Sequence, residues 1–277
     1  MSSCFDVEIA DGVAHVRLNR PDAYNTMTAE FWSELPELVD DIDRGAKARV
    51  IVVSSTGKHF SAGMDLSVFT GGSSLLDDGG VTETGRQRAH LWSTVQRLQD
   101  TFSCFERARM PVLAAVQGGC IGGAVDLVTA ADCRYASADA FFCVQEINIG
   151  MTADVGTLQR LPKVIPEGIA REMAYTGDRM GAARAKEVGL VNEVFDDHES
   201  LVAGVLDIAG RIASKSPLAI WGTKEMCNFT RDHTVADSLR YMASWQSGMF
   251  HGHDMAEQFT AKAEGRAPVF EELPRRS

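Results

Sequence analysis

The sequence predicts an α/β fold followed by a helical carboxyl-terminal region, and three observations lead to this prediction. Short apolar runs alternate with amphipathic helical patterns, glycine-rich turns follow two of these runs, and only helical periodicity is found after about residue 198. Strand, helix, strand order is typical of parallel sheets with helical crossovers. We therefore expect an α/β core domain over residues 1–198 and a helical region over residues 199–277.

Composition and charge narrow the class of protein. The 277 residues include 45% hydrophobic and 23% charged residues, which is typical of a globular protein. The formal net charge of −11 argues against nucleic acid or an anionic membrane surface as the main partner. The longest apolar stretch, Val112–Ala130, is interrupted by Gln117, Asp126 and several glycines, so no membrane span is expected.

The termini, cysteines and histidines indicate a cytoplasmic protein without a metal. Residues 1–6 lack the basic and apolar regions of a signal peptide, and Arg275-Arg276-Ser277 is not a peroxisomal signal. The six cysteines show no CxxC spacing and are expected to be buried thiols. His251-Gly252-His253 resembles a metal-ligand spacing, but residues two apart on a helix face different sides, so we expect no metal site.

The first 60 residues favour a hairpin, a helix and a buried strand. Val7–Ile9 and Val13–Leu18 flank the turn signal Asp11-Gly12. Apolar residues at helical spacing predict a helix over Thr28–Ile42, and the continuous apolar run Val50–Val53 predicts a strand covered on both faces.

The rest of the chain continues this alternation and then becomes helical. A polar, glycine-rich loop over residues 71–80 is expected to be mobile or exposed. A long helix follows, and its apolar residues at spacings of 4 and 3 are expected to face the core: Leu91, Val95, Leu98, Phe102 and Phe105. Further strands are predicted at Val112–Val116, Arg134–Ala136 and Phe141–Val144, and helices at about Glu199–Ala213, Leu218–Phe229 and Val235–Ala263.

Two glycine-bearing turns, His59–Asp65 and Gly118–Gly123, follow buried strands. Loops at the carboxyl ends of parallel strands lie on one side of a sheet, so we expect the turns to converge. Neither turn matches a P-loop, a GxGxxG fingerprint or a GxSxG nucleophile elbow, which disfavours nucleotide and serine hydrolysis. Two backbone N–H groups from such turns would suit a developing oxyanion, although turns that merely connect strand to helix are the alternative.

Three acidic residues follow the second turn in the sequence and are candidates for the same site. Asp126 falls in the first turn of the helix after Gly123, Glu146 follows an apolar strand, and Asp154 comes eight residues later. A carboxyl group in apolar surroundings has a raised pKa, which suits proton transfer near neutral pH. Each acid also has a purely structural alternative. Asp126 could complement the dipole at the start of its helix, Glu146 could be half of an ion pair, and Asp154 could cap the following helix. Together the three acids favour a proton-transfer site.

Two segments resemble the signature regions of the crotonase (enoyl-CoA hydratase/isomerase) superfamily. They are residues 60–66, FSAGMDL, and residues 115–127, AVQGGCIGGAVDL. More narrowly, residues 118–127, 140–142, 153–165 and 214–217 resemble the Δ3,5-Δ2,4-dienoyl-CoA isomerases. The resemblance covers nearly the whole chain.

This resemblance implies a crotonase (ClpP/crotonase-like) fold, which is a spiral of ββα units with a carboxyl-terminal helical region that builds trimers, often paired into hexamers. The implied partner is an acyl-CoA thioester substrate, with no separate cofactor because coenzyme A is part of that substrate. The backbone N–H groups of Met64 and Gly123 match the oxyanion hole of the family. The residues implied to bind substrate beside them are Ala62, Gly63, Asp65 and Gly122.

By the same resemblance, Asp126, Glu146 and Asp154 match the three acids of the dienoyl isomerases, at the same spacings of 20 and 8. The implied reaction converts 3,5-dienoyl-CoA to 2,4-dienoyl-CoA in fatty-acid β-oxidation. Asp154 is implied as the base at carbon 2 and Glu146 as the acid at carbon 6, with Asp126 orienting or polarising nearby. Either order of base and acid satisfies the spacing.

Two alternative functions stay open beside this one. An enoyl-CoA hydratase, which adds water to a 2-trans-enoyl-CoA, usually carries glutamates at the positions of Asp126 and Glu146, and here the first is an aspartate. A crotonase-fold binding protein without catalysis, such as the RNA-binding relatives, is disfavoured by the acidic balance. Lys58 is the candidate for contacts to the CoA phosphates, with an exposed loop lysine as the alternative. Cys120 has no base beside it in the sequence, which disfavours a nucleophile.

Overall fold

A six-stranded sheet and a three-stranded sheet carry the fold in the computed structural model, which describes residues 4–68, 80–250 and 252–276. The larger sheet has the order β1-β2-β3-β4-β6-β9 and the smaller one the order β5-β7-β8. The strands are β1 (Phe5–Ala10), β2 (Val13–Leu18), β3 (Val50–Ser55), β4 (Val112–Val116), β5 (Gly119–Ile121), β6 (Cys133–Ser137), β7 (Phe141–Cys143), β8 (Met180–Gly181) and β9 (Glu193–Phe195).

The larger sheet begins with the predicted hairpin and continues in parallel. β1 and β2 pair antiparallel around Asp11 and Gly12, which both have positive φ angles, of 50° and 77°, as a two-residue hairpin turn requires. β2, β3, β4, β6 and β9 then pair parallel to one another. Every residue of β3 and β4 is buried, as the continuous apolar runs predicted.

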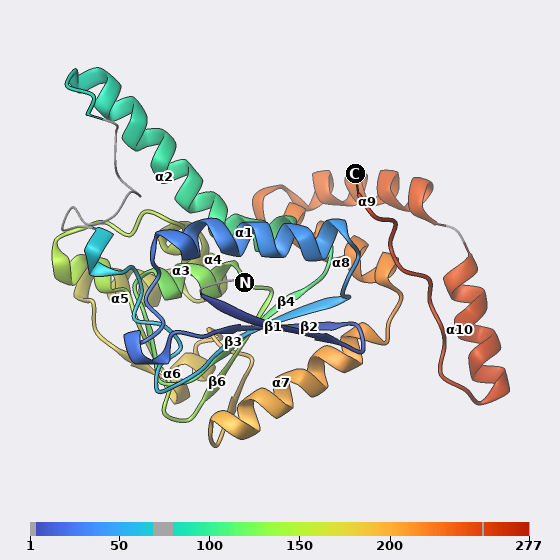
Figure 1. Cartoon of the computed structure of the whole chain (residues 1–277). Coiled ribbons are helices and arrows are strands. Elements are labelled where there is room, and N and C mark those ends of the chain that lie inside the picture. The colour runs from blue at the N-terminus through green and yellow to red at the C-terminus, as the bar shows by residue number, and fades with distance from the viewer. Residues whose placement is uncertain (1–3, 69–79, 251, 277) are drawn as a thin grey trace.

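Helices cover both faces of the larger sheet (Figure 1). They are α1 (Ala29–Arg44), α2 (Thr84–Arg107), α3 (Gly123–Ala130), α4 (Thr157–Val164), α5 (Glu167–Thr176), α6 (Ala182–Glu187), α7 (His198–Ala213), α8 (Pro217–Asp232), α9 (Val235–Met249) and α10 (His253–Glu264). The main core lies between the sheet and α1, α2 and α3, and includes Phe31, Phe102 and Phe105. Burying aromatic side chains of this size dominates the packing energy of such a layer.

A second, smaller core lies between the opposite face of the sheet and α7. Val50, Val52 and Leu113 of the sheet pack there against Leu201 and Val205 of α7. In the proposed division into residues 1–198 and 199–277, α7 is the first helix of the second part, and it packs directly on the sheet of the first part. Within the described ranges, none of the helices has the length and apolar character needed to cross a lipid bilayer.

Two helical patterns differ from the sequence-based expectation. α2 places Leu98, Phe102 and Phe105 in the core, but Leu91 is 52% exposed, because the amino-terminal part of α2 projects away from the body (Figure 1). The helix expected over residues 235–263 is divided into α9 and α10. Most of the polar loop expected over residues 71–80 lies outside the described residues, and of its residues only Gly80 is described.

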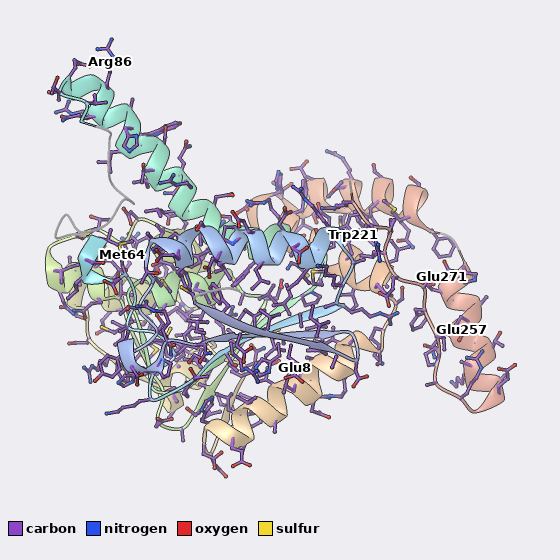
Figure 2. The ribbon with its side chains drawn as sticks, viewed as in Figure 1. Glu8, Met64, Arg86, Trp221, Glu257 and Glu271 are labelled. Atoms are coloured by element: carbon purple, nitrogen blue, oxygen red, sulfur yellow. The ribbon has the colours of Figure 1, made fainter. Side chains whose placement is uncertain are left out.

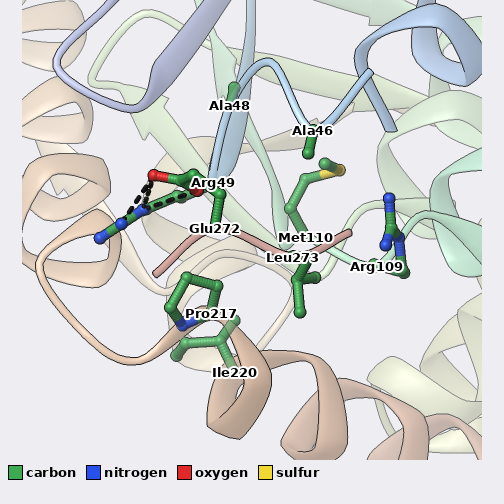
Figure 3. A pocket seen from close by; sticks show the side chains of 9 residues that line it. All are labelled: Ala46, Ala48, Arg49, Arg109, Met110, Pro217, Ile220, Glu272 and Leu273. Carbon is green, nitrogen blue, oxygen red and sulfur yellow. Dashed lines mark hydrogen bonds and ion pairs between the residues drawn. The ribbon is translucent and has the colours of Figure 1, made fainter. Parts of the chain in front are cut away.

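The carboxyl-terminal tail returns to the amino-terminal ends of β3 and β4, where two arginines hold it. Arg49 Nη2 donates to the carbonyl oxygen of Phe270 at 2.7 Å, and its Nε donates to Glu272 at 2.9 Å. Arg109 Nη1 donates to the carbonyl oxygen of Pro274 at 2.9 Å, and its Nε donates to buried Asp43 at 2.8 Å. Figure 3 shows a small pocket whose lining includes Arg49, Arg109 and Glu272 and none of the three acids.

Candidate active site

The two glycine-bearing turns converge, as the positions of their strands predicted. The first turn follows β3 and the second runs from β4 into α3. Phe60 N donates to Gln117 O at 2.8 Å, and Ser61 and the second turn exchange two backbone hydrogen bonds of 3.1 Å. These bonds make the turns one rigid unit at the carboxyl ends of β3 and β4.

This unit brings the backbone amides of Met64 and Gly123 close together. A Cβ atom placed on Gly123 would lie 4.0 Å from Met64 N, and one placed on Gly63 would lie 3.3 Å from Gly123 N. Among the residues that the structure describes, no hydrogen-bond acceptor is found for either amide. Gly123 is the first residue of α3, where N–H groups lack helical partners and the helix dipole is positive. Figure 2 labels Met64 at the opposite side of the molecule from Trp221.

The first turn requires glycine at position 63, both because the backbone conformation is left-handed and because there is no room for a side chain. Gly63 has a φ of +83°, and a Cβ atom there would approach Ile121 O to 2.6 Å. A side chain at this position would force the turns apart. The site therefore depends on close backbone approach.

Asp126 lies in the first turn of α3 and is fully buried. Its Oδ1 accepts a 2.5 Å hydrogen bond from the backbone amide of Thr157, the first residue of α4, while its Oδ2 is buried without a partner among the described residues. Burial raises the pKa of Asp126 to about 6, opposed by the bond from Thr157 and assisted by the charge of Asp154. Asp126 thus caps a helix, but α4 rather than its own.

Glu146 lies in the 3-10 helix Gln145–Ile149, directly after β7. Its carboxyl faces the second turn, since a Cβ atom on Gly122 would lie 3.2 Å from Oε1, while Oε2 is buried without a partner in the described part of the chain. Burial raises the pKa of Glu146 to about 7, and the charges of Asp126 and Asp154 add to this effect. A carboxyl with this pKa is partly protonated at neutral pH.

Asp154 lies in an irregular segment before α4 and is the most exposed of the three acids. Its carbonyl oxygen accepts a 2.8 Å hydrogen bond from Gln99 Nε2 of α2. Partial burial raises the pKa of Asp154. Because Asp154 acts electrostatically on both Asp126 and Glu146, the three acids share one site.

The remaining predicted residues surround this site in different ways. Asp65 closes the first turn, since its carboxylate accepts hydrogen bonds from Thr26 Oγ1 at 2.8 Å and from Ser67 N at 3.0 Å. Ala62 N donates to Tyr24 O at 3.0 Å, which anchors the same turn. These two residues therefore support the geometry of the turn.

Positive charge lies beside the second turn. Lys58 is exposed, and its charge lowers the pKa of His59, after the larger effect of burial. His59 Nδ1 accepts a 2.9 Å hydrogen bond from Gly119 N, which places this group at the turn itself. Arg179, which the sequence reasoning missed, lies over the Phe141 ring at 4.4 Å and also lowers the pKa of His59. Arg179 lies far along the chain from both turns, so no local sequence pattern pointed to it.

The second turn also contains a cysteine, Cys120. Burial raises the pKa of Cys120 well above its usual range, so the thiol stays neutral. Among the described residues, no group of three His, Cys, Asp or Glu side chains is arranged to hold a metal ion. His251, part of the metal-like spacing in the sequence, lies outside the described residues.

Comparisons with known proteins agree with this geometry. Residues 8–274 match the family model described as Enoyl-CoA hydratase/isomerase. The chain is 45% identical over 255 residues to the mitochondrial Delta(3,5)-Delta(2,4)-dienoyl-CoA isomerase of Homo sapiens, covering 92% of this chain and 77% of that protein. It is 39% identical to the peroxisomal Delta(3,5)-Delta(2,4)-dienoyl-CoA isomerase of Arabidopsis thaliana, covering 94% and 93% of the two chains.

A solved structure shares the fold over the same length. The enoyl-CoA hydratase from Bacillus anthracis superposes with a TM-score of 0.84 at 29% identity, covering 97% of this chain and 99% of that chain. The predicted crotonase fold is therefore confirmed. The expected cytoplasmic location is wrong, because the names of the human and Arabidopsis relatives place them in mitochondria and peroxisomes.

Proposed function

Because the chain belongs to the enoyl-CoA hydratase/isomerase family, as its sequence motifs indicated, we propose that it converts 3,5-dienoyl-CoA to 2,4-dienoyl-CoA in β-oxidation. The observation that carries this proposal is a cluster of three acids with raised pKa values, two of them with a buried carboxyl oxygen that lacks a partner, beside two amides that have no acceptor among the described residues. The names of the human and Arabidopsis relatives support the same reaction.

The amides of Met64 and Gly123 would bind the thioester oxygen. Removing a proton from carbon 2 moves negative charge onto that oxygen, and fixed N–H donors stabilise this charge without reorganising. The position of Gly123 at the start of α3 adds the positive end of a helix dipole.

Proton transfer would then involve two carboxyl groups. Asp154, as base, takes the proton from carbon 2, and the electron pair of that C–H bond delocalises onto the thioester oxygen as an enolate before it returns to form the bond C2=C3. The pair of C3=C4 moves to C4=C5, and the pair of C5=C6 takes a proton from Glu146 at carbon 6. The number of protons on the substrate is unchanged. Glu146 suits the acid role because its pKa of about 7 keeps it partly protonated at neutral pH.

Asp126 would act on its neighbours rather than on substrate. Its charge raises the pKa of Glu146, which favours the protonated acid, and its hydrogen bond to Thr157 fixes the start of α4. These contacts support the orienting role that the resemblance implied.

Substrate binding would use the turns and the adjacent cations. We propose that Ala62, Gly63, Asp65 and Gly122 shape the acyl-thioester site, and that Lys58 contacts a CoA phosphate. Coenzyme A would enter only as part of the substrate, with no separate cofactor.

Lys58→Met should raise KM several-fold and leave kcat unchanged, because an exposed cation contributes to binding and not to the proton-transfer step.

Assembly into trimers or hexamers is proposed for the helical region, residues 199–277. Its helices α9 and α10 extend to one side of the sheet, and exposed apolar side chains lie along them at Val235, Leu239 and Phe259. Apolar surface of this kind is usually covered by another chain. Light scattering of the purified protein tests the proposal, and a monomer would contradict it.

Hydration of a 2-enoyl-CoA is the alternative reaction, because the unpartnered oxygens Asp126 Oδ2 and Glu146 Oε2 could bind a water. Parallel assays of the purified protein with 3,5-dienoyl-CoA and 2-trans-enoyl-CoA distinguish the two functions. We expect faster turnover of the dienoyl substrate, and preferred turnover of the enoyl substrate would replace the isomerase proposal by the hydratase.

Exchange in D₂O tests the assignment of base and acid. Glu146→Gln should still exchange the carbon 2 protons of 3,5-dienoyl-CoA while forming little product, because the base remains. Asp154→Asn should lose both exchange and product. If instead Asp154→Asn exchanges the carbon 2 protons and Glu146→Gln does not, Glu146 is the base and Asp154 the acid.

A further inference from the structure

One face of α2 holds the backbone segment that carries Asp154. Gln99, Ser103 and Glu106 follow one another at spacings of four and three, so they lie on one side of the helix. All three contact the segment from Asp154 to Arg160. We call these three residues the α2 polar face.

The contacts from this face reach both ends of the segment. Gln99 Nε2 donates to the carbonyl oxygen of Asp154 at 2.8 Å. Arg160 Nη2 donates to Ser103 Oγ at 2.9 Å and to Glu106 Oε2 at 2.7 Å. Burial alone would raise the pKa of Glu106, but Arg160 and Arg231 lower it, so this carboxyl is held as an anion.

The backbone around Asp154, before α4 begins at Thr157, has little regular structure to fix it. Residues 151–154 belong to no helix or strand, and Gly156 has a φ of +137°, a conformation open mainly to glycine. On such a backbone, no neighbouring helix or strand fixes the position of the Asp154 carboxyl, so that position depends on how firmly the peptide unit of Asp154 is held. The Gln99 hydrogen bond is made to the peptide unit of Asp154 itself.

We propose that Gln99 is a positioning residue for Asp154: its side-chain amide fixes the peptide unit from which the base reaches carbon 2. This inference rests on the proposed function, because it takes Asp154 as the base. Ser103 and Glu106 extend the same support to Arg160, so the α2 polar face sets the distance between Asp154 and the oxyanion site.

Gln99→Met tests the proposal, because methionine keeps the length of the side chain and removes the donor. Gln96→Met is the matched control, since Gln96 is an exposed glutamine of the same helix whose side chain makes no hydrogen bond or ion pair in the described structure. A loss of alignment of this kind costs about tenfold or more in rate. We expect kcat of Gln99→Met to fall about tenfold, with KM within about twofold of native and an unchanged unfolding midpoint.

A substrate deuterated at carbon 2 gives a readout that a general structural defect would not change. The isotope effect on kcat should increase in Gln99→Met, because the misplaced base slows removal of the carbon 2 proton, and should stay native in Gln96→Met. Equal kcat values and isotope effects for the two variants would overturn the positioning role.

Asp154→Asn, measured in parallel, separates this proposal from the proposed function. If Asp154→Asn isomerises at the native rate, the assignment of the base fails, and the positioning role fails with it. If Asp154→Asn is inactive while Gln99→Met matches Gln96→Met, only the positioning role of Gln99 fails. In the double variant, Gln99→Met should add no further loss to Asp154→Asn.

Discussion

Replacing Glu146 by glutamine should change how the stability of the protein depends on pH. Burial, followed by the charges of Asp126 and Asp154, raises the pKa of Glu146 from 4.5 to about 7. One pKa unit corresponds to about 1.36 kcal/mol, so ionising this carboxyl costs the folded state about 3 kcal/mol more than it costs the unfolded chain.

The sign of the effect follows from which state binds the proton. Because the folded-state pKa is the higher one, folded protein binds more protons between about pH 4.5 and 7, and its free energy of unfolding falls as pH rises through that window. Glutamine cannot ionise. The free energy of unfolding of Glu146→Gln, relative to native, should therefore increase by about 2 kcal/mol between pH 5.5 and 8.5.

Urea unfolding followed by circular dichroism measures this difference at the two pH values, at one protein concentration so that assembly contributes equally. Comparing the two pH values removes any constant packing effect of the substitution. Glu172→Gln, which removes an exposed carboxyl on α5, controls for the loss of a charge as such. The reasoning is refuted if Glu146→Gln and native protein differ by the same free energy at both pH values.

Two further substitutions test the backbone of the site and the anchoring of the tail. Gly63→Ala should lower kcat by about 100-fold, because the new methyl group would lie 2.6 Å from a carbonyl oxygen of the second turn and displace an oxyanion donor. Gly265→Ala, at a φ of +69° with open space, carries the conformational strain alone and should keep native kcat. Arg109→Met should lower the free energy of unfolding by about 3 kcal/mol, because it removes the buried partner of Asp43 and leaves that carboxylate the longer ion pair, of 3.3 Å, to the more exposed Arg276. The exposed control Arg107→Met should cost under about 1 kcal/mol, and equal losses for the two arginines would contradict the burial argument.

The strands and the glycine turns could be predicted from the sequence because their physical causes are local. Burial on both faces gives β3 and β4 continuous apolar runs, close backbone approach requires glycine at Gly63, and a φ of +56° favours glycine at Gly122. The convergence of the turns followed from the parallel order of the strands. The three acids could be singled out because they stand next to these local signals.

Features that depend on distant contacts could not be predicted in the same way. Helical spacing placed Leu91 in the core, but that part of α2 has no partner to cover it in the described structure. The hydrogen bond from Gln99 to Asp154 joins residues 55 apart, and the one from Thr157 to Asp126 joins residues 31 apart. No pattern within a single helix or turn contains either pair.

The measurement that tests the central claim most directly is the rate of 3,5-dienoyl-CoA isomerisation by Asp154→Asn, followed by the ultraviolet absorbance of the conjugated product. Asparagine keeps the size of the side chain and removes the base, so kcat should fall by at least about 100-fold while the folded structure is retained. Isomerisation at the native rate would remove Asp154 from the mechanism and contradict the account.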